Sequence, residues 1–337
     1  MNSSRFEEIT SRYADLRIAV VGDYSCDRYL EIDPSREEVS IETGLPVYNV
    51  TKVRAQPGAS GTVLNNLVAL GIKEIWPIGF CGDDGEGFEL QRALKKLPGV
   101  QMDYFFESDQ QCTFTYCKPL VMDSGKPPRE LNRLDSKNWN PTPKALQEKL
   151  AAAVRTLASE VDVMIVLDQV DEPESGVVTQ RLLATIDEIK TQTLVIGDSR
   201  RGLKNWPHII YKMNADELAG LTEGEPNTAA SELAQHSGQP VFVSMAKNGV
   251  LCATPNGTVT HSPALPVRGK IDIVGAGDAV TANLAAAIAA DAKIPEALEL
   301  ANTAASVVIH KLGTTGTASL AEISATGNLV SPKSPVE

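Results

Sequence analysis

The chain of 337 residues has a hydrophobic fraction of 42% and a formal net charge of −12, from 31 Lys and Arg against 43 Asp and Glu. This length suits one large α/β domain or two domains, and the lack of a basic excess argues against binding along a nucleic-acid duplex. We expect a protein that does not enter a membrane, because no apolar run reaches the roughly 18 residues of a membrane helix and the N-terminal residues show no signal core. The five cysteines follow neither a disulfide nor a zinc pattern, so we expect a cytoplasmic protein.

The first part of the chain contains a strand, a glycine-rich turn and two segments that break the usual order. Residues 18–23 form an apolar run ending in Gly-Asp, which predicts a buried strand with polar residues at its carboxyl end. Residues 57–71 predict a turn that leads into a helix. The segments 47–53 and 112–122 alternate between apolar and polar residues, so we expect a small separate sheet that acts as a lid.

From residue 143 onward, strands and helices alternate regularly. Helices are predicted at about 143–159 and 177–191, and strands at 161–168 and 193–198. This order predicts an α/β fold with a doubly wound, mainly parallel sheet flanked by helices. The last residues, 328–337, are expected to form a frayed tail.

Residues 271–290 contain the most informative motif, a Gly-Ala-Gly turn followed by Asp and a run rich in alanine. The turn of Gly275, Ala276 and Gly277 is expected to start a helix, whose first N–H groups lack partners within the helix and attract an anion. Asp278 then has two interpretations. It is either an ordinary acidic residue at a helix N-terminus, or a general base beside amides that stabilise a transferred phosphoryl group.

Other polar clusters also allow a structural and a functional interpretation. The two aspartates of residues 22–27 can cap a loop or bind a ligand at the exit of the first strand. Asn214 can cap a helix or, with Glu217 one turn later, hold magnesium-bound water near a phosphate. The glycine-containing segments 78–87 and 311–317 favour structural turns. The lack of GxGxxG after the first strand argues against a nicotinamide dehydrogenase.

In this order, the motifs resemble those of the ribokinase-like (PfkB) family of carbohydrate kinases, with DIVGAGD in place of the signature DTxGAGD. The similarity runs from residue 18 to about 318. Within that family the chain is most similar to the kinase domain of the heptose-phosphate kinase and ADP-heptose synthase group, through the segments VVGDYSCDRY, SREEVSIETGLPVYNV, PGASGTVLNNLVALG, NRLD and HKLGT. The resemblance implies one ribokinase-like kinase domain over residues 1–330, with a small β lid.

The resemblance also implies roles for individual residues. Asp278 matches the general base, residues 275–277 match the anion hole, and Asn214 and Glu217 match the NxxE motif that organises magnesium and phosphate. Asp27 matches an acid that binds sugar hydroxyls. Gly58 matches the sugar-side turn, and Asp272 matches a residue that supports the signature loop. The positions that match the nucleotide pocket are Ser244, Gly249 and Asn302.

The chain departs from the family pattern on the sugar side. The turn that usually reads GGxxxN has Ala59 at the second glycine and Thr62 at the asparagine, and both count among the expected substrate-binding residues. Ile273 and Val274 replace threonines of the signature, and Ala246 replaces a frequent glycine near the nucleotide. These changes keep the general base and the anion hole of backbone amides. They alter groups that would recognise the sugar, so the identity of the sugar stays open.

The activity that the resemblance implies is ATP-dependent phosphorylation of a hydroxyl on a sugar or sugar phosphate, with D-glycero-D-manno-heptose 7-phosphate as the leading substrate. ATP and Mg²⁺ are the implied cofactors, with a monovalent cation such as K⁺ as a further candidate. The four histidines form no HxGH-type motif, so we expect a kinase without a nucleotidyltransferase domain. The alternatives are a kinase for another sugar, and a sugar- or nucleotide-binding protein of the same fold without turnover.

The lid segments, expected at about 29–56 and 111–123, have apolar residues on one face that a two-stranded flap cannot bury alone. The resemblance implies a homodimer in which two lids cover each other and close on the sugar. Arg36 and Lys118 are candidates to bind a substrate phosphate, and the alternative is that both are solvated lid charges.

Overall fold

The body of the protein is a mainly parallel sheet, in a computed structural model that describes residues 1–313 and 315–327. Within these residues the sheet has nine strands in the order β16-β15-β14-β13-β12-β11-β1-β6-β7. Every neighbouring pair from β14 to β7 is parallel, whereas β15 and β16 add an antiparallel edge. The strands are β1 (Arg17–Gly22), β6 (Glu74–Gly82), β7 (Phe105–Ser108), β11 (Val163–Asp168), β12 (Leu194–Ser199), β13 (Ile210–Asn214), β14 (Val241–Ser244), β15 (Val250–Ala253) and β16 (Val259–Ser262).

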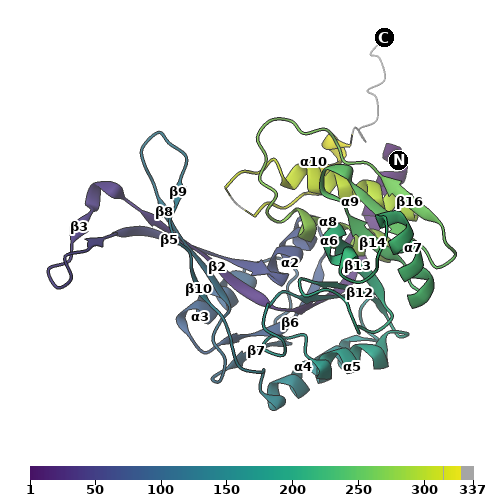
Figure 1. Cartoon of the computed structure of the whole chain (residues 1–337), viewed down its shortest axis with the longest axis horizontal. Coiled ribbons are helices and arrows are strands. Elements are labelled where there is room, and N and C mark those ends of the chain that lie inside the picture. The colour runs from purple at the N-terminus through teal and green to yellow at the C-terminus, as the bar shows by residue number, and fades with distance from the viewer. Residues whose placement is uncertain (314, 328–337) are drawn as a thin grey trace, which may run out of the picture.

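Helices cover both faces of this sheet because its central strands are apolar on both sides (Figure 1). Ile18 and Val20 of β1 pack into one core, and the alternate residues Ala19 and Val21 pack into the other. The first core contains α1 (Ser3–Ser11), α2 (Ser60–Ala69), α3 (Gly85–Leu94), α8 (Ala276–Ala289), α9 (Ile294–Val308) and α10 (Leu320–Thr326). The second contains α4 (Lys144–Leu157), α5 (Gln180–Ile189), α6 (Ala215–Ala219) and α7 (Pro226–Ser237).

The doubly wound α/β fold is therefore confirmed. The tail expected at 328–337 lies outside the described residues. Within the described part of the chain, no helix combines the length and the apolar character that crossing a bilayer requires.

A second sheet projects from the body (Figure 1) and has the order β10-β8-β2-β5, with β9 paired to β8. We call this sheet, together with the small hairpin of β3 and β4, the lid. Its strands are β2 (Tyr24–Ile32), β3 (Glu38–Val39), β4 (Pro46–Val47), β5 (Val50–Ala59), β8 (Thr115–Val121), β9 (Arg129–Glu130) and β10 (Leu134–Ser136).

The lid differs from the sequence-based expectation in two respects. The segments 47–53 and 112–122 do not form a two-stranded flap, because β2 lies between β5 and β8 and pairs with both. Asp27 consequently lies within a strand instead of in a loop. In addition, β9 and β10 extend this sheet to residue 136, beyond the expected segment 111–123. Long-range pairing explains both differences, since short polar strands carry little periodic signal.

Candidate active site

Polar residues gather where the parallel strands of the body end. Asp23 follows β1, and Asp168, Asp198, Asn214 and Ser244 lie at the ends of β11, β12, β13 and β14. The strand order makes these ends neighbours, and the register pairs Asn214 directly with Ser244. In open α/β sheets, ligands bind at this carboxyl edge. The edge is therefore the candidate active site.

The first turn of α8 supplies an anion-binding surface at this edge. Gly275 caps the helix with φ 82°, a left-handed conformation that glycine adopts without strain. Ala276 begins the helix, and Gly277 and Asp278 belong to its first turn, whose N–H groups have no partner within the helix. Thr62 of α2 lies beside Gly275. The structure thus brings the expected residues 275–278 and Thr62 together.

The carboxylate of Asp278 is partly exposed and, among the described residues, accepts no hydrogen bond and forms no ion pair. Burial raises its pKa to about 6, Lys212 and Arg200 oppose this rise, and the negative charges of Asp198 and Asp27 add to it. A carboxyl with a pKa near 6 is ionised at neutral pH and still accepts a proton readily. These properties suit a general base.

Sequence reasoning missed the buried network beneath this turn. Lys212 Nζ donates to Asp198 Oδ2 at 2.8 Å, and Thr281 Oγ1 donates to the same oxygen at 3.1 Å. Lys212 and Asp198 are only 5% and 7% exposed. A Cβ atom at Gly277 would lie 3.5 Å from Lys212 Nζ, so this ammonium lies next to the first turn of α8. The available signal was a charged residue near the end of each of two apolar strands.

Asn214 and Glu217 form a reciprocal cap at the start of α6. The Glu217 amide donates to Asn214 Oδ1 at 2.9 Å, and the Asn214 amide donates to Glu217 Oε2 at 2.7 Å. Burial raises the pKa of Glu217, the Asn214 amide opposes the rise, and Asp198 adds to it. Asn214 therefore caps the helix, as the structural interpretation of the sequence expected. A functional role is compatible with it, because the other carboxylate oxygen has no protein partner among the described residues.

The chemistry of this pair fits a magnesium ion that retains much of its water shell. No group of three or more His, Cys, Asp or Glu side chains within the described residues is arranged to hold a metal ion. Mg²⁺ in nucleotide sites, however, needs only one or two carboxylates, because water and phosphate oxygens complete its octahedron. Glu217 supplies such a carboxylate.

The expected sugar side lies on the lid. Asp27 is 6% exposed and accepts hydrogen bonds from Ser25 Oγ at 3.0 Å and Lys118 Nζ at 3.5 Å. Any side chain at Gly58 would collide with the Asp27 carboxylate, which explains the glycine. Ala59 retains the glycine-like geometry of the turn, with φ 52° and ψ −120°.

Of the two expected phosphate-binding cations, only Lys118 lies in this region. Lys118 contacts Asp27 at 3.5 Å, next to the sugar-side turn. Arg36 lies in a short 3-10 helix (Pro34–Arg36), where it pairs with Asp33 at 3.2 Å. Within the described part of the chain, no recorded contact joins Arg36 to Asp27 or Asp278.

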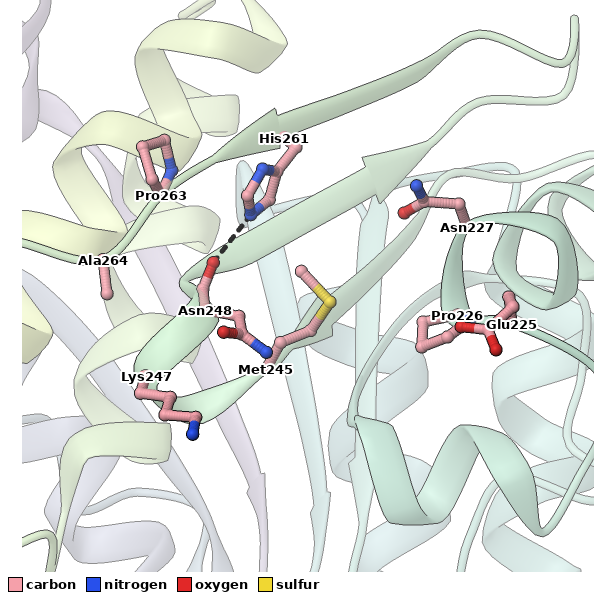
Figure 2. Close-up of a pocket in the computed structure, with 9 residues that line it drawn as sticks. All are labelled: Glu225, Pro226, Asn227, Met245, Lys247, Asn248, His261, Pro263 and Ala264. Atoms are coloured by element: carbon pink, nitrogen blue, oxygen red, sulfur yellow. Dashed lines mark hydrogen bonds between the residues drawn. The ribbon is translucent and has the colours of Figure 1, made fainter.

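The expected residues of the nucleotide pocket lie next to residues that line a cavity of about 530 Å³ at the end of β14. Ser244 Oγ donates to the carbonyl of Met213, Gly249 turns the chain with φ 91°, and Asn302 Nδ2 donates to the carbonyl of Ser262 at 2.7 Å. These three residues do not line the cavity themselves, but each adjoins or contacts a residue that does or that precedes one. Figure 2 shows the lining residues, which are Glu225, Pro226, Asn227, Met245, Lys247, Asn248, His261, Pro263 and Ala264.

Asp272 stabilises the loop that precedes the Gly-Ala-Gly turn. Its own amide donates to the carbonyl of Ile309 at 2.8 Å, and its Oδ1 accepts a hydrogen bond from the Val274 amide at 3.1 Å. A hydrogen bond thus holds the loop that precedes Gly275 against the C-terminal end of α9.

Comparisons with known proteins bear on the family and the fold of the chain. A family model described as pfkB family carbohydrate kinase matches residues 17–320. The bifunctional protein HldE of Bradyrhizobium sp. is 27% identical over 320 residues, which cover 92% of this chain and 63% of that protein. The protein of the same name from Caulobacter vibrioides is 30% identical over 314 residues, covering 90% and 62%. The chain thus spans less than two thirds of the length of these relatives.

Solved structures share the fold at lower identity. Ribokinase from Arabidopsis thaliana, complexed with ribose and ATP, matches with a TM-score of 0.64 and 18% identity over 93% of this chain and 98% of that chain. Phosphofructokinase-2 from Escherichia coli, in complex with potassium, matches with a TM-score of 0.70 and 19% identity over the same shares, 93% and 98%.

The buried ion pair of the site generates a stability prediction. Asp198→Asn removes the charge that compensates buried Lys212, so the free energy of unfolding should fall by about 3 kcal/mol in urea titrations. The control is Asp187→Asn, which breaks the more exposed Lys190–Asp187 pair and should cost less than about 1 kcal/mol. Equal effects of the two substitutions would contradict the importance that we assign to the buried pair.

Proposed function

Because the chain belongs to the pfkB family of carbohydrate kinases, we propose that it phosphorylates a heptose phosphate, with D-glycero-D-manno-heptose 7-phosphate as its leading substrate. The chain is an ATP-dependent carbohydrate kinase, and the choice of sugar rests on its similarity to the HldE proteins. The observation that carries the proposal is the Asp278 carboxylate, unpaired among the described residues, beside the first-turn amides of α8, of which only that of Ala276 has a recorded acceptor, the carbonyl of Ile273. Ala59 and Thr62 leave a kinase for another sugar as the alternative.

In the proposed reaction, Asp278 accepts the proton of the attacking sugar hydroxyl. The hydroxyl oxygen forms a bond to the γ-phosphorus, and the bond from this phosphorus to the β,γ-bridging oxygen breaks, which leaves ADP. The first-turn amides of α8 and the ammonium of Lys212 stabilise the negative charge on the transferred group. No covalent intermediate with the protein is needed, because positioning and charge stabilisation suffice.

The cavity at the end of β14 is the proposed site of the adenosine part of ATP, with Ser244, Gly249 and Asn302 supporting the segments that line it. Glu217, with Asn214 acting through water, would hold Mg²⁺, which neutralises charge on the phosphates when bound. A monovalent cation such as K⁺ is proposed beside the loop of Asp272.

We further propose that two copies of the chain pair through their lids. Val39, Ile41, Leu45 and Tyr48, at or near the hairpin of β3 and β4, are 67%, 102%, 64% and 51% exposed. Several exposed apolar side chains within one short hairpin are unfavourable in water and are typical of an interface. Since identical lids offer each other the same apolar surface, a two-fold pairing would cover both.

Asp278→Asn tests the base. It should lower kcat by a factor of about 10² to 10⁴ and leave ATP binding nearly unchanged, because the shape is kept and only the proton acceptor is lost. The assay is ADP release with Mg²⁺-ATP and a panel of free and phosphorylated sugars, with Asp103→Asn as the control at the opposite edge of the sheet. Absence of ADP release from the unsubstituted protein with every sugar would refute the proposed function.

The rate should also depend on pH in a defined direction. Since burial raises the pKa of Asp278 to about 6 and the ionised form is the base, kcat/KM should be constant above pH 7 and fall as the pH drops through 6. Measuring kcat/KM from pH 5 to 8 checks this, and the residual activity of Asp278→Asn should lack the same titration. A rate that rises on acidification would contradict the assignment.

Light scattering tests the pairing of lids. The expected mass is that of two chains at micromolar concentration, and Ile41→Asp should give the mass of one chain because a charge would be buried at the interface. Ser35→Asp, on the same part of the chain but at a polar position, is the control. A monomeric mass of the unsubstituted protein with full kinase activity would exclude the paired lid.

A further inference from the structure

One face of the lid is lined with polar side chains that the register places side by side. Asp27 of β2 pairs with Gln56 of β5 and with Tyr116 of β8, and Tyr29 pairs with Lys118. Residues directly opposite each other in neighbouring strands lie on the same face. Lys118 Nζ contacts Asp27 Oδ2 and the Tyr29 hydroxyl at 3.5 Å each, which shows that these side chains meet.

Arg200 connects this face of the lid to the carboxyl edge of the body. It follows β12 directly, and its backbone amide donates to the carbonyl of Asp168 at 3.0 Å. Its side chain is exposed to solvent and reaches the lid, where Nη1 donates to the hydroxyl of Tyr116 at 3.1 Å. Arg200 is also close enough to Asp278 to oppose the effect of burial on the pKa of that carboxyl.

Arg200 differs from the other cations around Tyr116 in its lack of a carboxylate partner. Among the described residues it forms no ion pair, and Tyr116 is its recorded side-chain contact. The neighbouring cations form ion pairs with carboxylates, with N–O distances of 2.7 to 3.5 Å: Arg133–Asp135, Lys137–Asp171 and Lys118–Asp27. An arginine with one nitrogen bonded to a hydroxyl, and with no recorded partner for the others among the described residues, presents parallel N–H donors that match a phosphate.

We propose that Arg200, oriented by Tyr116, binds a phosphate ester that the sugar already carries, so that the substrate class is sugar phosphates and excludes free sugars. This inference rests on the proposed function and identifies what the sugar side recognises. The sugar's own phosphate is favoured over the γ-phosphate of ATP because Tyr116 is the strand neighbour of Asp27. The transferred group, by contrast, is served by the amides of α8 and by Lys212.

Calorimetry without ATP tests the inference directly, with two matched pairs of probes: the heptose with and without its 7-phosphate, and fructose with and without its 6-phosphate. At least one phosphorylated sugar should bind tenfold or more tightly than its free form. Arg200→Met should weaken binding of that sugar phosphate by about tenfold to a hundredfold, because a charge-assisted contact is lost, and leave the free sugar unaffected. Arg200→Lys should recover part of the loss, and Tyr116→Phe should lose less than Arg200→Met.

Inorganic phosphate probes the same position without any sugar. It should bind the unsubstituted protein in the millimolar range and should not bind Arg200→Met. Arg36→Met is the matched control, an exposed lid arginine paired with Asp33, and it should change none of these affinities. Thermal unfolding of Arg200→Met should be unaltered, since the side chain is exposed and forms no ion pair.

Three results would overturn the inference: no binding of any phosphate-bearing probe, equal affinity for the free and phosphorylated sugars, or unaltered affinity after Arg200→Met. A raised KM for ATP in Arg200→Met, with unchanged affinity for the sugar phosphate, would also overturn it by assigning Arg200 to the nucleotide. Binding that depends on Arg200 but is never followed by ADP release would uphold the inference and refute the proposed kinase reaction. The two failures are therefore distinguishable.

Discussion

The ion pair buried beneath the first turn of α8 is the interaction on which the site depends. Lys212 comes from β13, Asp198 from β12 and Thr281 from α8, so one carboxylate joins the sheet edge to the helix. Breaking such a pair leaves a charge without compensation in a buried environment, which costs several kcal/mol. The N-terminus of α8 is consequently held at one position relative to the strand ends, and the amides of that turn and Asp278 are held with it.

The order of strands explains how one edge serves two kinds of ligand. The cavity of the proposed nucleotide site lies where β14 ends, third from one edge of the sheet, whereas the lid leaves the body directly after β1, third from the other edge. The ends of β13, β12 and β11 lie between these two places, and the first turn of α8 lies against Lys212 of β13. A phosphoryl group that passes from nucleotide to sugar would cross this intermediate position.

The charges within the site are balanced differently from those of the whole chain. The protein has a formal net charge of −12, yet Lys212, Lys118, Arg200 and Arg201 all approach the edge where the candidate ligands meet. Arg201 is bound to the buried Asp168 at 2.9 Å and so stabilises the protein itself. Three of these cations pair with carboxylates, whereas Arg200 has no carboxylate partner among the described residues, which is why we assign it to an anion.

The amino-acid sequence by itself determined the regular elements of the body and the start of α8. Apolar runs and helical periodicity depend on neighbouring residues, and the left-handed cap of Gly275 is a local property of glycine, so these features could be predicted without the fold. The mutual capping of Asn214 and Glu217 is equally local. Only the tertiary structure decided that β2 lies between β5 and β8, that Asp198 compensates Lys212, and that Arg200 meets Tyr116 instead of a carboxylate. The Asp198–Lys212 and Arg200–Tyr116 partners are 14 and 84 residues apart in the chain. No short-range pattern specifies which of many polar residues will meet when the strands align.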